Sequence, residues 1–281
     1  MSTQTISINK AEPRETSGCP IHALVEWKAS GSLLTRLGVL AFGLIAYAAF
    51  FATICYSIGF VSGIIVPKTI NSGTPAALVP ALLINGAMLF AFVVQHTIMA
   101  RPRFKAWFTQ FIPHAMERSV FVLLSSAILA VTYWQWRPLP DVIWSISNPI
   151  LSNGLFALSM LGWVIVFAST FHISHFDLFG VRQILTNAAG RDYVPVSFRL
   201  VGLYKLVRHP LMVGFLIAFW ATPEMTAGHL FFAIMTTAYI IFGTTIEERD
   251  LVAAFGEKYI EYRKSVRGLI PLPRFNKGGV K

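Results

Sequence analysis

The stretch Leu203-Tyr-Lys-Leu-Val-Arg-His-Pro210 opens the part of the sequence that decides the fold. An apolar run follows it, then a turn-forming segment at 222–228, and then a second apolar run, 230–246, which ends abruptly in Glu247-Glu248-Arg249-Asp250. Two antiparallel helices joined by a short turn bring their far ends together. We therefore expect Arg208-His209-Pro210 to face Glu247 and Glu248 at one end of a helical hairpin.

The composition places this hairpin in a membrane. The chain has 281 residues, of which 55% are hydrophobic and only 13% are charged. A hydrocarbon core of roughly 30 Å needs about 20 apolar residues per helix. We predict an all-α, polytopic integral membrane bundle with about six transmembrane helices, where five to seven are compatible with the pattern. The six apolar runs are 37–62, 78–99, 119–136, 150–171, 210–226 and 229–246.

The distribution of positive charge predicts the orientation of the bundle. The net charge is +10, and 21 of the 23 Lys and Arg residues fall in the segments 1–36, 100–118, 172–209 and 247–281. With six spans these segments share one side, which the positive-inside rule assigns to the cytoplasm. We expect a bacterial inner membrane protein with both termini cytoplasmic. Its basic charge is then explained by topology and by attraction to lipid headgroups, and nucleic-acid binding is not indicated.

The domain organisation is simple. We expect residues 1–36 to form a cytoplasmic tail that ends in an interfacial helix at about 21–36, and residues 37–281 to form a single membrane domain. Its ligand-binding core is predicted at about 196–267. Cys19 and Cys55 lie in the tail and inside the first span, which does not favour a disulfide. No cleaved signal peptide is expected.

The start of the fifth span has the features of an anion site. Pro210 suits the first turn of a helix, because its missing N–H would have no partner there. The N–H groups of Leu211 and Met212 would then point out of the helix end. Arg208 and His209 add positive charge, so a carboxylate or a phosphate fits this end of the hairpin.

The facing end of the hairpin predicts a cationic partner. Glu247 and Glu248 lie where the helix dipole disfavours carboxylates, so either Arg208 or a bound ammonium should neutralise them. A ligand with both a carboxylate and an ammonium satisfies the two ends together. S-adenosylmethionine is such a ligand. The aromatic faces offered to its adenine or sulfonium are those of Tyr204, Tyr259 and Tyr262.

The motifs of the hairpin resemble a known family. The C-terminal pattern resembles the isoprenylcysteine carboxyl methyltransferase superfamily, which comprises integral membrane enzymes that use S-adenosylmethionine. A longer pattern, over about residues 35–271, resembles bacterial methanethiol S-methyltransferases, which carry an NnrU-like domain and make dimethyl sulfide. The C-terminal pattern consists of Tyr204, Arg208-His209-Pro210, Glu247-Glu248 and Phe255-Gly-Glu-Lys-Tyr-Ile-Glu-Tyr-Arg263. The stretches of the longer pattern are Gln95-His-Thr-Ile-Met-Ala-Arg-Pro-Arg-Phe-Lys-Ala-Trp, Glu117-Arg-Ser, Trp134-Gln-Trp-Arg-Pro, His175-Phe-Asp-Leu-Phe-Gly-Val-Arg and Phe219-Trp-Ala-Thr-Pro.

This resemblance implies S-adenosylmethionine-dependent methylation of a small thiol. It implies cofactor contacts at Glu247, with Glu248 next. The other implied contacts are Tyr204, His209, Pro210, Leu211 and Met212. Two positions depart from the superfamily, which often has Tyr at the position of Met212, while the prenylcysteine enzymes have Arg at the position of Gly243. The absence of that Arg argues against methylation of a carboxylate.

A thiol substrate needs a base, because thiols are mostly protonated at neutral pH. We favour His175 paired with Asp177, and His96 is a second candidate. His172 lies three residues before His175, so one helix face can hold both. These three residues of the fourth span and the following loop, His172, His175 and Asp177, are also a candidate metal site, although we expect no metal.

Three alternatives stay open at this stage. Relatives of the NnrU-like group include a haem-dependent carotene isomerase, so a haem-binding isomerase or redox protein is possible, with His96 and His209 as candidate axial ligands. A non-catalytic membrane scaffold is another. The third is a methyltransferase that acts on larger lipophilic thiols. The sequence does not indicate an oligomeric state.

Overall fold

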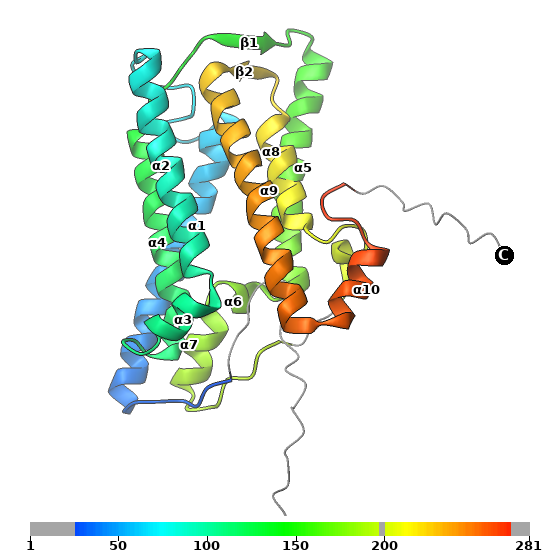
Figure 1. Cartoon of the computed structure of the whole chain (residues 1–281). Helices are drawn as coiled ribbons and strands as arrows, with labels where there is room; N and C mark the ends of the chain where they lie inside the picture. Colours follow the sequence, from blue (N-terminus) through cyan, green and yellow to red (C-terminus); the bar gives the residue numbers. More distant parts are fainter. Residues whose placement is uncertain (1–25, 197–199, 271–281) are drawn as a thin grey trace, which may run out of the picture.

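The computed structural model describes residues 26–196 and 200–270 and shows a bundle of long helices (Figure 1). Five helices are long and apolar enough to cross a membrane, which confirms the predicted helical membrane bundle. They are α1 (Leu33–Ser62), α2 (Leu78–Met99), α4 (His114–Gln135), α5 (Pro149–Ile173) and α9 (Ala227–Phe255).

Shorter elements close the two ends of the bundle. At one end an antiparallel pair of strands, β1 (Val142–Ser145) and β2 (Glu224–Thr226), joins the loop after α4 to the loop before α9. The opposite end carries α3, α6 and α7, with α10 beside the last turns of α9 (Figure 1). These elements are α3 (Pro102–Phe108), α6 (His175–Leu178), α7 (Val181–Ala188), a 3-10 turn η1 (Gly202–Lys205) and α10 (Glu257–Ser265).

The predicted fifth span, 210–226, is wrong in length. Helix α8 (Pro210–Trp220) has 11 residues, which is about 16 Å at 1.5 Å per residue and too short to cross a bilayer alone. It ends early because the chain after it turns into β2, which pairs with β1. The chain nevertheless returns through the bundle between α5 and α9 (Figure 1), so the antiparallel hairpin of α8 and α9 is retained.

Helix α8 packs closely on α5. A Cβ at Gly162 would lie 2.6 Å from the backbone nitrogen of Ala218, and one at Gly214 would lie 2.7 Å from the carbonyl oxygen of Gly162. The hydroxyl of Ser159 also donates to the carbonyl of Ala218 at 2.9 Å. Small residues let two membrane helices touch through their backbones. This contact fixes the position of Pro210 at the start of α8.

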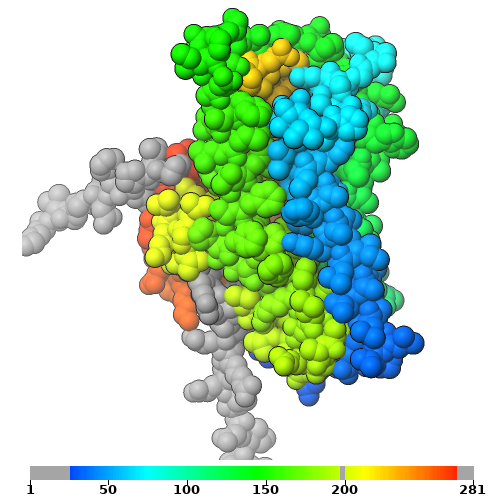
Figure 2. Space-filling view, turned by 180° about the vertical axis from the view of Figure 1, so that it is seen from behind, coloured from blue at the N-terminus to red at the C-terminus, as the bar shows by residue number. Residues whose placement is uncertain are grey.

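The N-terminal segment differs from the expected interfacial helix. Residues 21–25 of that predicted helix lie outside the described residues. Trp27 instead pairs with Tyr193 through backbone hydrogen bonds of 3.4 and 2.9 Å, and the two rings stack at 5.2 Å. Beyond this pairing, α1 runs alongside α7, as Figure 2 shows from behind. The interfacial helix is therefore wrong for residues 26–32.

Candidate active site

A large cavity lies inside the bundle, with a volume of about 850 Å³. Pockets for small molecules range over roughly 300–1,000 Å³, so this one is large enough for a ligand much bigger than a small thiol. Most of the residues that the sequence indicates lie in its wall. Those that line the cavity are His96, His172, His175, Tyr204, Arg208, His209, Leu211, Met212, Glu247, Tyr259 and Tyr262.

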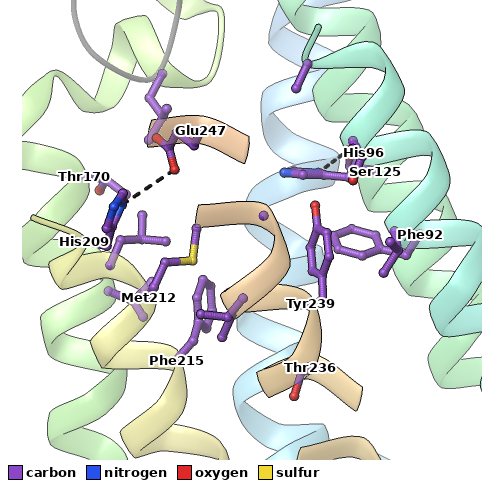
Figure 3. A pocket seen from close by; sticks show the side chains of 18 of the residues that line it. Phe92, His96, Ser125, Thr170, His209, Met212, Phe215, Thr236, Tyr239 and Glu247 are labelled. Carbon is purple, nitrogen blue, oxygen red and sulfur yellow. Dashed lines mark hydrogen bonds and ion pairs between the residues drawn. The ribbon is translucent and has the colours of Figure 1, made fainter. Parts of the chain in front are cut away.

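The two ends of the hairpin meet as predicted. His209 lies directly before α8, with Nε2 at 3.1 Å from Oε1 of Glu248 and Nδ1 at 3.7 Å from Oε2 of Glu247. Figure 3 shows the imidazole and the Glu247 carboxylate turned toward one another across the gap between α8 and α9. Arg208 reaches the same Glu248 oxygen at 2.5 Å. The meeting of these groups is confirmed, whereas their role in binding a cofactor stays a prediction.

The two glutamates have different surroundings. Glu248 contacts Arg208, His209 and, at 3.3 Å, the guanidinium of Arg263, and it does not line the cavity. Glu247 does line the cavity, and the ion pair recorded for it within the described chain is the longer one to His209. Of the two cationic partners expected for the glutamates, Arg208 therefore neutralises Glu248. Glu247 keeps a carboxylate available to a bound ammonium.

Arg208 also ties down the segment that follows α10. Its guanidinium donates to the backbone carbonyls of Val266 and Arg263 as well as to Glu248. The backbone N–H of Arg208 donates to the carbonyl of Arg267 at 2.8 Å. These bonds make Arg208 a structural centre of the cluster, in addition to its place in the cavity wall.

The three tyrosines form the wall beside this cluster. The hydroxyl of Tyr262 donates to the backbone carbonyl of Tyr204 at 2.6 Å, and the rings of Tyr259 and Tyr262 meet edge to face at 5.7 Å. Burial raises the pKa of Tyr259 and of Tyr262, so both phenols stay neutral at physiological pH. Neutral aromatic faces suit an adenine ring or a sulfonium.

The start of α8 completes the set of groups that a zwitterion needs. Pro210 occupies the first position of the helix, and Leu211 and Met212 follow in its first turn. N–H groups in a first turn have no carbonyl partner within their own helix and favour anions. A carboxylate at this turn and an ammonium at Glu247 would satisfy both sides. The residues present therefore fit the amino-acid end of S-adenosylmethionine.

His175 lies in the cavity wall, but its nitrogens already have partners. Nδ1 lies 2.8 Å from Oγ1 of Thr170, and Nε2 lies 2.9 Å from the hydroxyl of Tyr47. Thr170 has one hydroxyl hydrogen, which it donates to the carbonyl of Phe167 at 2.7 Å. Nδ1 of His175 must then carry the proton, and Nε2 accepts from Tyr47. Burial lowers the pKa of His175, so the ring is neutral, but its lone pair is in use.

The expected pair of His175 and Asp177 is wrong. The buried carboxylate of Asp177 accepts from the hydroxyl of Tyr193 at 2.7 Å and from Arg182 at 3.1 Å. The single turn of α6 carries Asp177 away from the cavity, and there it anchors Tyr193, the partner of Trp27. Its role is to hold the loops at this end of the bundle together.

His172 contacts the backbone of Ala168 and Gly202, and it does not share the predicted helix face with His175. Its Nδ1 donates to the carbonyl of Ala168 at 2.7 Å, and its ring covers Gly202, where a Cβ would lie 2.0 Å from it. Because α5 ends at Ile173, His172 and His175 do not share a continuous helix face. Within residues 26–196 and 200–270, no group of three His, Cys, Asp or Glu residues is arranged to hold a metal ion.

His96 is the histidine whose orientation suits a base. It projects from α2 into the cavity opposite Glu247 and His209 (Figure 3). Its Nδ1 lies 3.4 Å from Oγ of Ser125. That hydroxyl donates toward Oε1 of Gln95 at 3.0 Å and the carbonyl of Phe121 at 2.9 Å. The Ser125 oxygen therefore accepts from Nδ1–H of His96, which leaves the lone pair on Nε2.

Two features of the site were missed by sequence reasoning. Tyr239 of α9 meets His96 edge to face at 6.3 Å, and its hydroxyl points into the same space (Figure 3). Arg101, just after α2, forms a 2.6 Å ion pair with Asp250 of α9, and both line the cavity. Asp250 belongs to the charged end of the second apolar run, so the predicted topology already placed these two charges on one side. Tyr239 gave no signal, because a tyrosine inside an apolar run is ordinary.

Known proteins resemble this chain over most of its length. Methanethiol S-methyltransferase 1 of Bradyrhizobium diazoefficiens is 48% identical over 247 residues, which cover 88% of this chain and 87% of the relative. Methanethiol S-methyltransferase of Mycobacterium tuberculosis is 46% identical over 240 residues, which cover 85% of this chain and 98% of the relative. Human Nurim is more distant, with 26% identity over 175 residues, 58% of this chain and 65% of Nurim.

No family model matches the chain, and no solved structure matches it. The match to the methanethiol S-methyltransferases nevertheless covers 87–98% of their own length. The methanethiol S-methyltransferases match at 46–49% identity over 85–88% of this chain. The chain belongs to the methanethiol S-methyltransferase family.

Proposed function

We propose that this protein methylates methanethiol to dimethyl sulfide with S-adenosylmethionine as methyl donor. The observation that carries the proposal is the cavity in which the Glu247 carboxylate and His209 face His96 across a mostly apolar space. The names of the relatives supply the substrate. The positive charge at the end of the bundle that carries Glu247 supports an inner-membrane protein whose cavity opens to the cytoplasm and whose termini are cytoplasmic.

The charged end of the cavity holds the donor in this proposal. Glu247 binds the ammonium, the first turn of α8 with Leu211 and Met212 receives the carboxylate, and Tyr204, Tyr259 and Tyr262 offer ring faces. Arg208 and Glu248 neutralise each other and keep His209 in place. When bound, S-adenosylmethionine supplies a sulfonium methyl group. The residues named here orient the donor and give it a site with matching charges.

His96 acts on the thiol in this proposal. Its Nε2 accepts the thiol proton, while Nδ1–H stays bonded to Ser125. The sulfur forms its new bond to the methyl group as the methyl–sulfonium bond breaks, so the products are the sulfide, S-adenosylhomocysteine and one proton. The hydroxyl of Tyr239 donates to the sulfur as negative charge develops there. A positioned general base contributes about 10²–10⁴-fold to a rate.

The apolar wall has a function of its own. It holds methanethiol, which carries no charge, and it excludes water that would solvate the thiolate. The ion pair of Arg101 and Asp250 covers the charged end of the cavity from the side of α2. Alignment of the two reactants and removal of water are the main requirements of a methyl transfer of this kind.

Headspace gas chromatography tests the proposal. Membranes that contain the protein receive methanethiol and S-adenosylmethionine, and dimethyl sulfide is measured. We expect the wild-type protein to make it and His209→Ala and Glu247→Ala to make none. His114→Ala and Glu257→Ala, which change exposed residues outside the cavity, should retain activity.

The same preparation separates the proposal from the haem alternative. A purified sample with a Soret band and no dimethyl sulfide production would contradict a methyltransferase and support a haem protein. A sample that neither binds the donor nor makes dimethyl sulfide would support the scaffold alternative instead.

A further inference from the structure

The cavity is much longer than methanethiol requires. Its wall includes Glu247 and Phe232, which are fifteen residues apart on α9, or about 22 Å along the helix axis. We call the part remote from Glu247 the apolar arm. It is lined by Leu89, Leu129, Tyr133, Trp163, Phe219 and Phe232.

The arm is continuous with the reacting end. Both belong to one cavity, and in Figure 3 Phe215 and Thr236 lie beyond Met212 and Tyr239 on the side away from Glu247. A thiol whose sulfur lies between His96 and the donor would therefore project its substituent past Thr236 and into the arm. A single methyl group leaves that space unused.

Most polar groups in the arm are already satisfied by the protein. The hydroxyls of Ser57 and Tyr133 bond each other at 2.6 Å. The hydroxyl of Thr236 donates to the carbonyl of Phe232 at 2.7 Å, and that of Ser126 donates to the carbonyl of Val122 at 2.8 Å. The indole N–H of Trp163 is the exception within the described chain. The arm thus presents aromatic rings and aliphatic groups, which suit a hydrocarbon chain.

We infer that the apolar arm receives the hydrocarbon chain of thiols longer than methanethiol, so that linear alkanethiols of about four to eight carbons are also substrates. This inference rests on the proposed function, because it uses the same donor and the same base. The thiol proton goes to His96, the sulfur–methyl bond forms and the donor's sulfonium bond breaks. The products are an alkyl methyl sulfide, S-adenosylhomocysteine and one proton.

A series of thiols tests the inference. Methanethiol, ethanethiol, butanethiol, hexanethiol and octanethiol are compared by kcat/KM, with the sulfide products identified by mass spectrometry. Burial of each additional methylene can lower KM by up to about fourfold until the arm is full. Calorimetric binding of hexanethiol in the absence of the donor gives a readout that does not depend on turnover.

A variant that blocks the apolar arm tests where the hydrocarbon chain of the thiol lies. Thr236→Phe places a ring in the passage to the arm and should lower the ratio of hexanethiol to methanethiol turnover at least tenfold. The matched control is Ile234→Phe, which adds a ring of similar size to the same helix at a position 49% exposed on the outer surface. This control should leave the ratio unchanged.

The outcomes are distinct. Methylation of methanethiol with no turnover or binding of butanethiol and longer thiols would overturn the inference and leave the proposed function intact. An equal ratio of hexanethiol to methanethiol turnover in Thr236→Phe and the wild-type protein would also overturn it, because the hydrocarbon chain of the thiol would then lie outside the apolar arm. Failure with methanethiol itself would contradict the proposed function.

Discussion

Two histidines in the same cavity wall differ in what they can do. His175 is held between Thr170 and Tyr47, and the lone pair on its Nε2 accepts a hydrogen bond from a tyrosine of another helix. His96 has one bonded nitrogen, and its Nε2 faces the cavity opposite Glu247. Both rings line the cavity, yet only the second has a lone pair to offer a substrate. Availability of the lone pair, rather than proximity, separates a base from a structural histidine.

The largest expected effect comes from removing the proposed base. His96→Gln should lower kcat/KM for methanethiol by about 10²–10⁴-fold, because the proposed reaction uses Nε2 of His96 to take the thiol proton. The loss should shrink at high pH, where the thiol ionises without help. The measurement is the pH profile of dimethyl sulfide production.

His175→Gln is the matched change for that experiment. It should lower activity by less than about threefold at pH 7.5. The comparison of the two histidines would be contradicted if His175→Gln abolished turnover and His96→Gln did not.

A large effect on stability is expected at Arg208. The side chains of Arg208 and Glu248 form an ion pair of 2.5 Å and are only 10% and 14% exposed, and removal of one partner from a buried ion pair costs up to about 3–5 kcal/mol. We expect Arg208→Met to lower the thermal unfolding temperature in detergent strongly. Glu257→Gln, which breaks a pair whose side chains are 70% and 71% exposed, should change it little. Equal effects of the two substitutions would show that the Arg208 cluster is not a structural centre.

A smaller effect on catalysis is expected at Tyr239. Tyr239→Phe keeps the ring contacts to His96 and Phe92 but removes the hydroxyl that points into the cavity. A hydrogen bond to a charged group is worth about 1.5–3 kcal/mol, so kcat should fall about tenfold or more. The control is Tyr56→Phe, which removes a tyrosine hydroxyl of α1 outside the cavity wall and should leave kcat unchanged. Unchanged kcat in Tyr239→Phe would exclude contact between this hydroxyl and the reacting sulfur.

The smallest effect concerns the pH dependence of stability. Burial lowers the pKa of His175 below its ordinary value near 6.5, so the unfolded chain binds a proton more readily than the folded one. The contribution of His175 is therefore present above about pH 6.5 and is lost as the pH falls below it. Unfolding temperatures measured between pH 7.5 and 5 should decline less steeply in His175→Gln. An identical slope in both proteins would contradict this assignment.

The sequence was sufficient for features that depend on hydropathy and charge. Long apolar runs predicted the helical bundle, and the positions of Arg208, His209, Glu247 and Glu248 at the ends of two runs predicted that they meet. Helix length and direction determine such meetings, so they follow from local sequence. The length of α8 was predicted wrongly, because the expected span was carried through Thr226 although Thr222-Pro223-Glu224 are turn-forming residues, and pairing with β1 makes Glu224 to Thr226 extended.

Side-chain direction explains the rest of the differences. The spacing of His175 and Asp177 gave no indication that α6 is a single turn, which points one side chain into the cavity and the other toward Tyr193. Tyr239 and Ser125 lie in apolar runs far from any motif, and only the packing of α2, α4 and α9 brings them to His96. Such contacts depend on tertiary structure, which a residue pattern does not encode directly.

Calorimetric titration with S-adenosylhomocysteine tests the central claim most directly, since it measures the donor site without turnover. We predict that Glu247→Gln weakens binding by about 100-fold or more, because a buried ammonium loses its carboxylate. Glu224→Gln, at the opposite end of the bundle, should bind like the wild-type protein. Unchanged affinity in Glu247→Gln would show that the meeting of α8 and α9 does not form the donor site.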